Sequence, residues 1–449
     1  MKIQNYDYLN QNIDVSEQFH TLGNVTFLAQ KLNHFDGKRG ALQYSRFERK
    51  GRVAFNMYST PFEASQSWAF PPVYSDSPEY PFQVEFINES TVRIRTTGVS
   101  TDHDLANRDA ESLMLDGIPH SLKVTPYISD ETHAVYRTEK LELELIYEPF
   151  HVILRDRKGK ELTKTLHQSD SRCLQNYNPM PFSYVRSSTD MHKYPAVSFS
   201  IKPDEHFFGC GESFTKLDKL GQKVVLWTKD ANGVETEDLY KPVPFYVSSR
   251  GYGVFYHTSC PITLDFGREY AEAQTAYLGD ENIDFFLFVG TPKEVLGAYT
   301  DLTGKSPAPP LWSYGLWMSR ISYRSETETR EVAKALQEHR IPCDVIHLDT
   351  NWFEEDWLCN YKFAPSRFEN PEKMIRDLRE MGYKICLWQI PYFTPKNELY
   401  DEVMEQGLAI YGEEGKLPTD DAILDFSNPA AVAWYQKQLK SLFDMGVCA

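Results

Sequence analysis

A proline-rich stretch divides the sequence into two parts that follow different periodicities. Ser306-Pro-Ala-Pro-Pro310 holds three prolines in five residues, and proline is excluded from helix interiors and inner strands alike. Before this stretch, short strand-like runs follow one another without amphipathic helices; after it, strands and helices alternate. We therefore expect a β-domain over residues 1–300, a stiff linker over residues 301–310 and an α/β domain over residues 311–449.

The first part carries the period-two alternation of strands. Thr91–Thr96 and Leu141–Leu145 alternate apolar and polar side chains, which predicts strands with one buried face. Phe150–Arg155, a glycine turn and Glu161-Leu162 predict a hairpin. Four further runs are strand-like, at residues 197–201, 245–247, 253–256 and 284–289. Many short strands without intervening helices predict a β-sandwich.

The second part alternates strands with helices, which indicates a parallel sheet or barrel. Expected strands cover residues 314–319, 343–349 and 383–390, expected helices cover residues 326–339, 372–381, 396–405 and 429–443, and a fourth strand begins at residue 446. Only 449 − 310 = 139 residues follow the linker, against about 250 in a (β/α)8 barrel. We expect the first half of such a barrel, with an exposed strand edge that leaves the chain alone poorly stable and inactive.

Composition and charge exclude several classes of protein. The 47 Lys and Arg against 64 Asp and Glu give a net charge of 47 − 64 = −17, which disfavours nucleic acid as a partner. The mean hydropathy is −0.49, and no apolar run approaches the ~20 residues that cross a bilayer. The 41% hydrophobic content is too high for a disordered chain.

The cysteines and the amino-terminal residues bear on location. The seven cysteines form no CxxC pair, so we expect reduced thiols. The first residues contain neither a basic nor an apolar signal region. We therefore expect a cytoplasmic protein.

Polar and aromatic residues gather where the expected barrel strands end. Asp349 ends the second strand and is followed by Thr350 and Trp352, and Trp388 lies near the end of the third strand. Barrel chemistry sits at these ends, and carboxylates beside aromatic rings suit a sugar. Two other interpretations of Asp349 remain: a cap for the following loop, or a metal ligand together with His347, although no third ligand stands out.

Other segments carry weaker signals. Arg320, Ser322 and Tyr323 follow the first strand and are also compatible with an ordinary loop, and Trp388 with a barrel-core residue. Asp425 precedes a helix, and we expect it to fix that turn rather than to contact substrate. Gly209-Cys-Gly-Glu212 lacks the length and the lysine of a phosphate loop and predicts a bulge or tight turn instead. The sequence contains neither GxSxG nor a helix-opening GxGxxG, which argues against serine hydrolases and dinucleotide-dependent enzymes.

The ordered set of motifs resembles glycoside hydrolase family 31, from about residue 140 to the last residue. The matching segments of the first part are Phe207–Glu212, Lys219–Gln222, Leu226–Asp230, Leu239-Tyr240, Pro244-Phe245 and Gly251–Phe255. Those of the second part are Pro309-Pro310, Tyr314–Trp317, His347–Asp349, Phe363, Pro365, Arg367-Phe368, Pro371, Met374, Gly382–Lys384, Leu387-Trp388 and Asp425–Pro429. The resemblance implies a galactose-mutarotase-like β-sandwich followed by a (β/α)8 barrel. It also implies a retaining α-xylosidase or α-glucosidase that uses two aspartates and neither a metal nor an organic cofactor.

The resemblance also implies roles for single residues. Asp349 would bind a hydroxyl of the sugar in subsite −1, and Trp388 would line that subsite. Asp230 would reach over the mouth of the pocket on the leaving-group side. Thr350, Trp352 and the pair Ser322-Tyr323 would crowd or spare the C6 group and so separate xylosides from glucosides.

The family's nucleophile follows a Met-Gly-Val segment, and Met445-Gly-Val447 matches that segment. The resemblance thus places the nucleophile and the acid/base beyond Ala449, so we expect no catalytic residue among the 449. The expected partner is a small oligosaccharide or glycoside, with no nucleic acid and no membrane, and a homo-oligomer of the full-length enzyme is left open. The alternatives are a non-catalytic carbohydrate-binding remnant and an α-transglycosylase.

Overall fold

The computed structural model describes residues 13–21, 23–49, 62–64, 77–98, 112–167, 182–229, 241–412 and 415–449. The chain divides into two compact units, Met1–Lys305 and Ser306–Ala449. Helix α4 (Pro292–Thr303) crosses residue 300, where the sequence placed the end of the β-domain. A capping box between Thr291 and Glu294 starts this helix, so the extended linker begins at Gly304.

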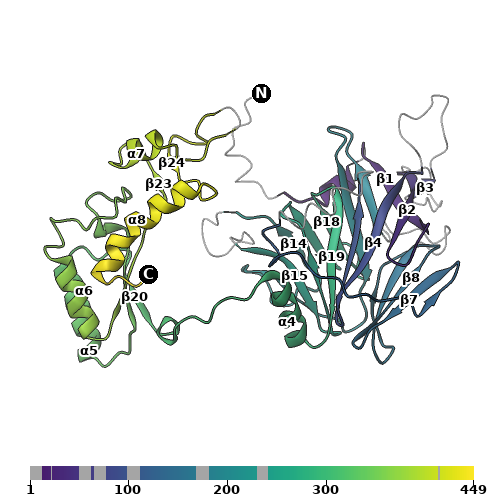
Figure 1. The fold of residues 1–449 in the computed structure, drawn as a ribbon, viewed down its shortest axis with the longest axis horizontal. Helices are drawn as coiled ribbons and strands as arrows, with labels where there is room; N and C mark the ends of the chain where they lie inside the picture. The colour runs from purple at the N-terminus through teal and green to yellow at the C-terminus, as the bar shows by residue number, and fades with distance from the viewer. Residues whose placement is uncertain are drawn as a thin grey trace, which may run out of the picture. The chain divides into compact units, whose positions relative to one another are not determined.

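A 14-stranded sheet dominates the N-terminal unit, and every strand pairing in it is antiparallel (Figure 1). Its strands, in order across the sheet, are β13 (Phe207–Gly211), β15 (Pro242–Ser248), β16 (Tyr252–Tyr256), β19 (Asn282–Val289), β5 (Thr91–Thr97), β4 (Glu79–Asn88), β2 (Arg39–Arg49), β1 (Val25–Asn33), β11 (Phe182–Arg186), β12 (Lys193–Ser200), β18 (Ala273–Leu278), β17 (Ile262–Phe266) and β14 (Lys223–Leu226), with β3 (Phe62–Ala64) beside β2. The short helix α2 (Glu17–His20) precedes β1.

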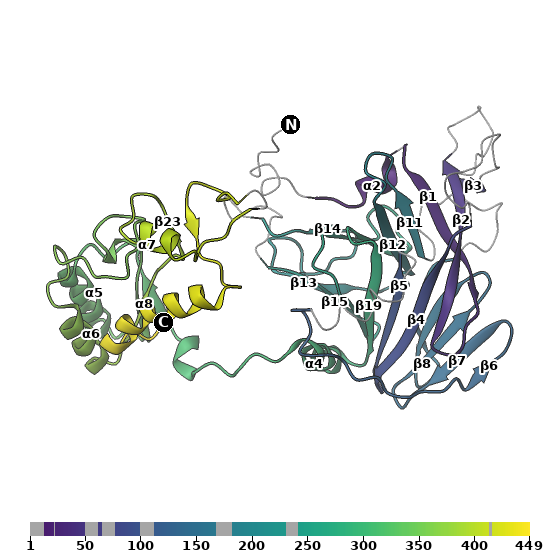
Figure 2. The ribbon, with the colours of Figure 1, turned by 45° about the horizontal axis from the view of Figure 1, so that its top comes forward.

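A second, five-stranded sheet lies beside the first, next to β4 (Figure 2). Its antiparallel strands are β10 (Glu161–Lys164), β9 (His151–Asp156), β8 (Leu141–Ile146), β7 (His133–Arg137) and β6 (Ile128–Ser129). Strand β8 alternates buried and half-buried residues, as its sequence predicts. The Phe86 and Tyr136 rings, 5.2 Å apart, and the Phe82 and Phe150 rings, 5.3 Å apart, join the two sheets. One cluster of buried apolar side chains therefore spans both sheets.

Strand β5 departs from the prediction of one buried face, because all seven of its residues are buried. It lies between β4 and β19, inside the large sheet. On its polar face, Arg93 bonds Asp284 and lies 4.7 Å from the Phe286 ring centre. Arg95 pairs with Glu85. Paired charges thus occupy a face that the alternation assigned to solvent.

The segment from Gly209 to Gly211 is a bulge, as expected. Strand β13 loses register against β15 between these two glycines, and all three residues have positive φ. A Cβ on Gly211 would lie 2.0 Å from the Lys241 carbonyl oxygen. Glycine is therefore required where the two strands approach each other most closely.

The C-terminal unit is built on a three-stranded parallel sheet, in the order β20 (Trp317–Ser319), β21 (Val345–Leu348), β22 (Lys384–Leu387). Cys448 N donates to the Ile385 carbonyl at 2.8 Å, and Leu387 N donates to that of Ala449 at 2.9 Å. The residues expected to begin a fourth strand thus bond β22, although they are not themselves in a strand.

Helices α5 (Glu326–Glu338), α6 (Pro371–Glu380) and α8 (Pro429–Met445) follow the expected ranges, and α5 and α6 lie side by side (Figure 1). The side chains of Ser325, Asn370 and Asn428 cap their amino ends. The unit also contains the 3-10 helices η2 (Leu311–Tyr314) and η3 (Thr350–Trp352) and helix α7 (Tyr400–Glu405), which is shorter than predicted. The strands β23 (Tyr392–Phe393) and β24 (Ala422–Ile423), on either side of α7 in the sequence, form an antiparallel pair that was not predicted.

Within the described residues, no helix is long and apolar enough to cross a membrane. No two of the six cysteines in these ranges form a disulfide with each other, and Cys173 lies outside them.

Candidate functional site

Asp349 directly follows β21 and remains accessible, with 27% of its side chain exposed. Its Oδ1 accepts a hydrogen bond from Thr350 N at 2.8 Å and so caps η3. Its Oδ2 lies 3.6 Å from His347 Nε2. The two interpretations of Asp349 are therefore compatible, because one oxygen holds the loop while the carboxylate still faces solvent.

His347 also contacts the neighbouring strand, since its Nδ1 lies 3.1 Å from Cys386 Sγ. No group of three or more His, Cys, Asp or Glu side chains within the described ranges could hold a metal ion. The pair His347 and Asp349 thus lacks a third ligand there.

Trp388 lies beside Asp349 because of the pairing of β21 with β22. Its backbone N donates to the Leu348 carbonyl at 2.8 Å, directly before Asp349 in the sequence. Its own carbonyl accepts from Trp352 Nε1 at 2.7 Å. The indole is half-buried and contacts two rings, Phe353 at 6.1 Å and Trp357 at 5.4 Å.

Trp352, Tyr323 and Thr350 are buried in this structure, and their expected contact with the sugar stays a prediction. The side chains of Trp352 and Tyr323 are 0% and 1% exposed, and Thr350 is also buried. Trp352 is packed between Phe353 and Phe363. Burial raises the pKa of Tyr323 to about 12, so its hydroxyl stays protonated. Tyr323 Oη donates to the Met318 carbonyl of β20 at 3.4 Å, and Thr350 Oγ1 lies 3.3 Å from Ser322 Oγ.

Trp357 is a residue that the sequence analysis missed. Its side chain is 56% exposed, and its ring meets that of Trp388 edge to face at 86°. The available signal was a tryptophan inside the acidic run Glu354-Glu-Asp-Trp357, close behind a strand end. Such an apolar ring in a polar loop has no core to fill.

Of the two remaining candidate aspartates, the structure describes only Asp425. Asp425 accepts from the backbone N of Ser427 at 2.9 Å and from its hydroxyl at 2.6 Å. These two bonds lower the pKa of Asp425 and fix the turn before α8, as expected. Asp230 lies outside the described residues.

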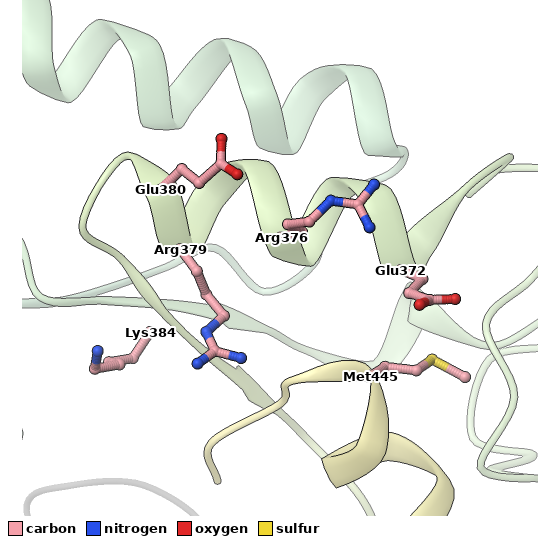
Figure 3. A pocket seen from close by; sticks show the side chains of 6 residues that line it. All are labelled: Glu372, Arg376, Arg379, Glu380, Lys384 and Met445. Carbon is pink, nitrogen blue, oxygen red and sulfur yellow. The ribbon is translucent and has the colours of Figure 1, made fainter.

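A pocket of about 430 Å3 lies elsewhere in the C-terminal unit (Figure 3). It is lined by Glu372, Arg376, Arg379, Glu380, Lys384 and Met445. Lys384 begins β22 whereas Trp388 follows its end, so this pocket opens at the opposite end of the strand from Asp349. Its charged lining includes no ring on which a sugar could stack.

Comparison with known proteins agrees with this division of the chain. Residues 81–265 match the glycosyl hydrolase 31 N-terminal galactose mutarotase-like domain. Residues 306–449 match the glycosyl hydrolases family 31 TIM-barrel domain.

Three relatives illustrate the similarity. The chain is 37% identical to alpha-xylosidase XylQ of Lactiplantibacillus pentosus over 57% of its own length and 34% of that protein. It is 29% identical to an alpha-xylosidase of Emericella nidulans over 80% of its length and 49% of that protein. It is 32% identical to alpha-glucosidase 2 of Bacillus thermoamyloliquefaciens over 54% of its length and 32% of that protein. The chain thus spans between a third and a half of these relatives.

A solved structure shares the fold. The dextranase FjDex31A of Flavobacterium johnsoniae superposes with a TM-score of 0.70 at 21% identity, over 94% of this chain and 47% of that one. The two family matches lie in the expected order and fall in the two units of the structure. The chain belongs to glycoside hydrolase family 31.

Proposed function

We propose that the chain belongs to a retaining exo-α-glycosidase that removes terminal α-xylosyl or α-glucosyl residues from oligosaccharides or glycosides. In this proposal the N-terminal unit is a mutarotase-like β-sandwich and the C-terminal unit is the first half of the catalytic barrel. The observation that carries it is that Asp349, whose carboxylate is accessible, and Trp388 follow the carboxyl ends of two adjoining parallel strands, where barrel enzymes bind substrate. Support comes from the similarity to alpha-xylosidases and an alpha-glucosidase.

Asp349 and Trp388 have complementary parts in this proposal. The carboxylate accepts hydrogen bonds from sugar hydroxyls, and such bonds to a charged group are stronger than neutral ones. The indole face covers the C–H face of the pyranose ring. Together they orient the ring that is transferred.

The proposed reaction uses two further carboxyl groups. One carboxylate attacks the anomeric carbon while an acid protonates the leaving oxygen and then activates water. This chemistry calls for neither a metal nor an organic cofactor. We assign neither role to Asp349 or Asp425, because the resemblance places the nucleophile after the Met445-Gly-Val447 segment and the acid/base after the nucleophile.

The test is hydrolysis of 4-nitrophenyl α-D-xyloside and 4-nitrophenyl α-D-glucoside by the complete gene product. We expect turnover of at least one, with NMR showing that the first sugar product keeps the α configuration. The proposal would be contradicted if neither glycoside is hydrolysed, or if the β-anomer of the sugar is the first product. The 449-residue chain, assayed in parallel, serves as the comparison.

A further inference from the structure

Trp357 combines exposure with a fixed position. Trp352, five positions earlier in the sequence, is fully buried, whereas Trp357 leaves more than half of its surface in water. The ring contact that holds it is the edge-to-face contact with Trp388 at 5.4 Å. Within the described residues, Trp357 is therefore not part of the apolar core that contains Trp352.

The backbone of Trp357 adopts a conformation that side chains disfavour. Its φ is +65°, in the left-handed region where a bulky residue is strained. Such strain persists only where the surroundings impose it, and it concentrates at functional sites.

The surrounding loop imposes this conformation through several bonds. Asp356 Oδ1 accepts from Trp357 N at 3.1 Å, and Leu358 N donates to the Glu355 carbonyl at 3.1 Å. After Trp357, the buried Asn397 amide donates to the Cys359 carbonyl at 2.9 Å. Before Trp357, the Arg367 guanidinium bonds the carbonyls of residues 351, 353 and 354. Both sides of the loop are thus anchored, and Trp357 is held in place.

Trp357 and Trp388 meet at a right angle, and we name this pair the aromatic corner. Trp388 is half-buried and adjoins Asp349, while Trp357 is the more exposed ring. Two perpendicular indoles offer faces to two different rings, an inner one beside Asp349 and an outer one. The acidic side chains of Glu355 and Asp356 are exposed next to the outer ring, where they can accept hydrogen bonds from hydroxyl groups.

We propose that Trp357 stacks on the leaving group of the substrate, which is a second pyranosyl ring or an aryl group. This inference rests on the proposed function, in which Asp349 and Trp388 hold the transferred sugar. It makes Trp357 a specificity residue that favours substrates whose aglycone has a flat apolar face.

The test compares leaving groups with and without a ring in the complete gene product. Wild type, Trp357→Ala and Trp357→Phe are assayed on the 4-nitrophenyl α-glycoside and on the α-glycosyl fluoride of whichever sugar the wild type hydrolyses faster. We expect Trp357→Ala to lower kcat/KM for the nitrophenyl glycoside roughly tenfold, with less than about a twofold change for the fluoride. Trp357→Phe should recover most of the loss. Phe443→Ala is a matched control, because Phe443 is 51% exposed on α8.

Three results would overturn the inference. Equal kcat/KM values of Trp357→Ala and wild type on the nitrophenyl glycoside would show that Trp357 does not bind the leaving group. Equal losses on both substrates, with a Tm below that of Phe443→Ala, would make its role structural. If the wild type hydrolyses neither substrate, the proposed function is wrong, and the inference that rests on it is wrong too. This result differs from the first two, in which the wild type is active.

Discussion

Asp349 shows how one side chain serves the fold and the site together. Its Oδ1 holds the Thr350 amide at 2.8 Å, while the carboxylate remains accessible at the end of β21. An amide oxygen can replace Oδ1 in the cap, but an amide carries no charge for a sugar hydroxyl. The two duties can therefore be separated by substitution.

Asp349→Asn in the complete gene product should preserve the free energy of unfolding. It should lower kcat/KM, on whichever nitrophenyl glycoside the wild type hydrolyses faster, by about 10- to 150-fold, because a hydrogen bond to a charged group is lost. Asp349→Ala should show the same loss and also cost about 1 kcal/mol of unfolding free energy, since the cap is removed. Activity measurements together with urea unfolding check both. Retention of activity within twofold in Asp349→Asn would exclude Asp349 from substrate binding.

Arg93 and Asp284 form a buried ion pair in the N-terminal unit, with side chains only 1% and 4% exposed. Burial by itself would raise the pKa of Asp284, but the Arg93 guanidinium and the His257 ring outweigh it and hold this pKa well below its ordinary value. Because the folded pKa is the lower one, the unfolded chain takes up the proton first as the pH falls. The stability that the pair contributes is therefore present above about pH 4 and is lost as the pH falls below that value.

Asp284→Asn should lower the unfolding free energy at pH 7 by about 3–5 kcal/mol, because it breaks the buried ion pair between Asp284 and Arg93. Denaturant unfolding between pH 3 and pH 7 should also show a shallower loss of stability on acidification in this variant than in the wild type. Parallel pH profiles for the two proteins would contradict the assignment. Asp204→Asn, at an exposed turn of the same unit, serves as the control.

Motif position predicts which residues gather at a site better than it predicts where their side chains point. The sequence placed Asp349 and Trp388 together, and the structure has them on adjoining strand ends. It also expected Trp352 and Tyr323 to face the sugar, yet both are buried. The direction of the Trp352 side chain depends on its contacts with Phe363 and with the Trp388 carbonyl, which no local pattern encodes.

At the level of an element, the bulge of β13 shows how close packing between two strands constrains the residue type. Gly211 has φ +88°, and its Cα approaches the Lys241 carbonyl so closely that a methyl group would overlap it. Gly221, in the same unit, has a similar φ of +76° but open space around it. Substituting the two glycines therefore separates two contributions to the free energy of unfolding: the backbone strain of a side chain at positive φ, and its steric overlap with a neighbouring strand.

Gly221→Ala should lower the unfolding free energy by about 1–2 kcal/mol, the cost of a left-handed residue. Gly211→Ala should cost at least about 1 kcal/mol more, because the strand must also move away from Lys241. Urea unfolding monitored by tryptophan fluorescence measures both variants. Equal losses would show that the close approach of β13 and β15 is relaxed in solution.

Helices were easier to predict than short strands, for a physical reason. The pairs Asn370-Pro371 and Asn428-Pro429 predict the starts of α6 and α8, because the cap residue and the first turn of a helix are adjacent in the sequence. The two-residue strands β23 and β24 are too short to show a period. Helix α4 was missed although Thr291 and Glu294 form its capping box, because it follows a long β-region.

At the scale of the whole chain, the division between Lys305 and Ser306 is the main feature. Residues 305–310 are all exposed, and their prolines keep the segment extended. Brief trypsin treatment should cut after Lys305 and leave two fragments, residues 1–305 and 306–449, that mass spectrometry identifies. Lys305→Gln should abolish this cut. Degradation of both units in one step, without these fragments, would contradict the division.

The sequence predicted two regions of different class but not the order of strands in the large sheet. Neighbours such as β5 and β19, or β1 and β11, come from distant parts of the chain. Arg93 and Asp284, which bond each other across β5 and β19, are 191 positions apart. Periodicity reports the local burial of a residue and carries no information about such a distant partner.

This interleaving has a consequence for synthesis on the ribosome. Strand β5 leaves the ribosome early, but β19, its hydrogen-bonding neighbour, ends at Val289. At about 5–20 residues per second, the edge of β5 waits roughly ten to forty seconds for its partner. The α/β unit, by contrast, pairs each strand with one made shortly before it. The nascent β-unit is therefore the stage at which this protein depends most on chaperones, and slowing translation after Val289 should matter less than slowing it between β5 and β19.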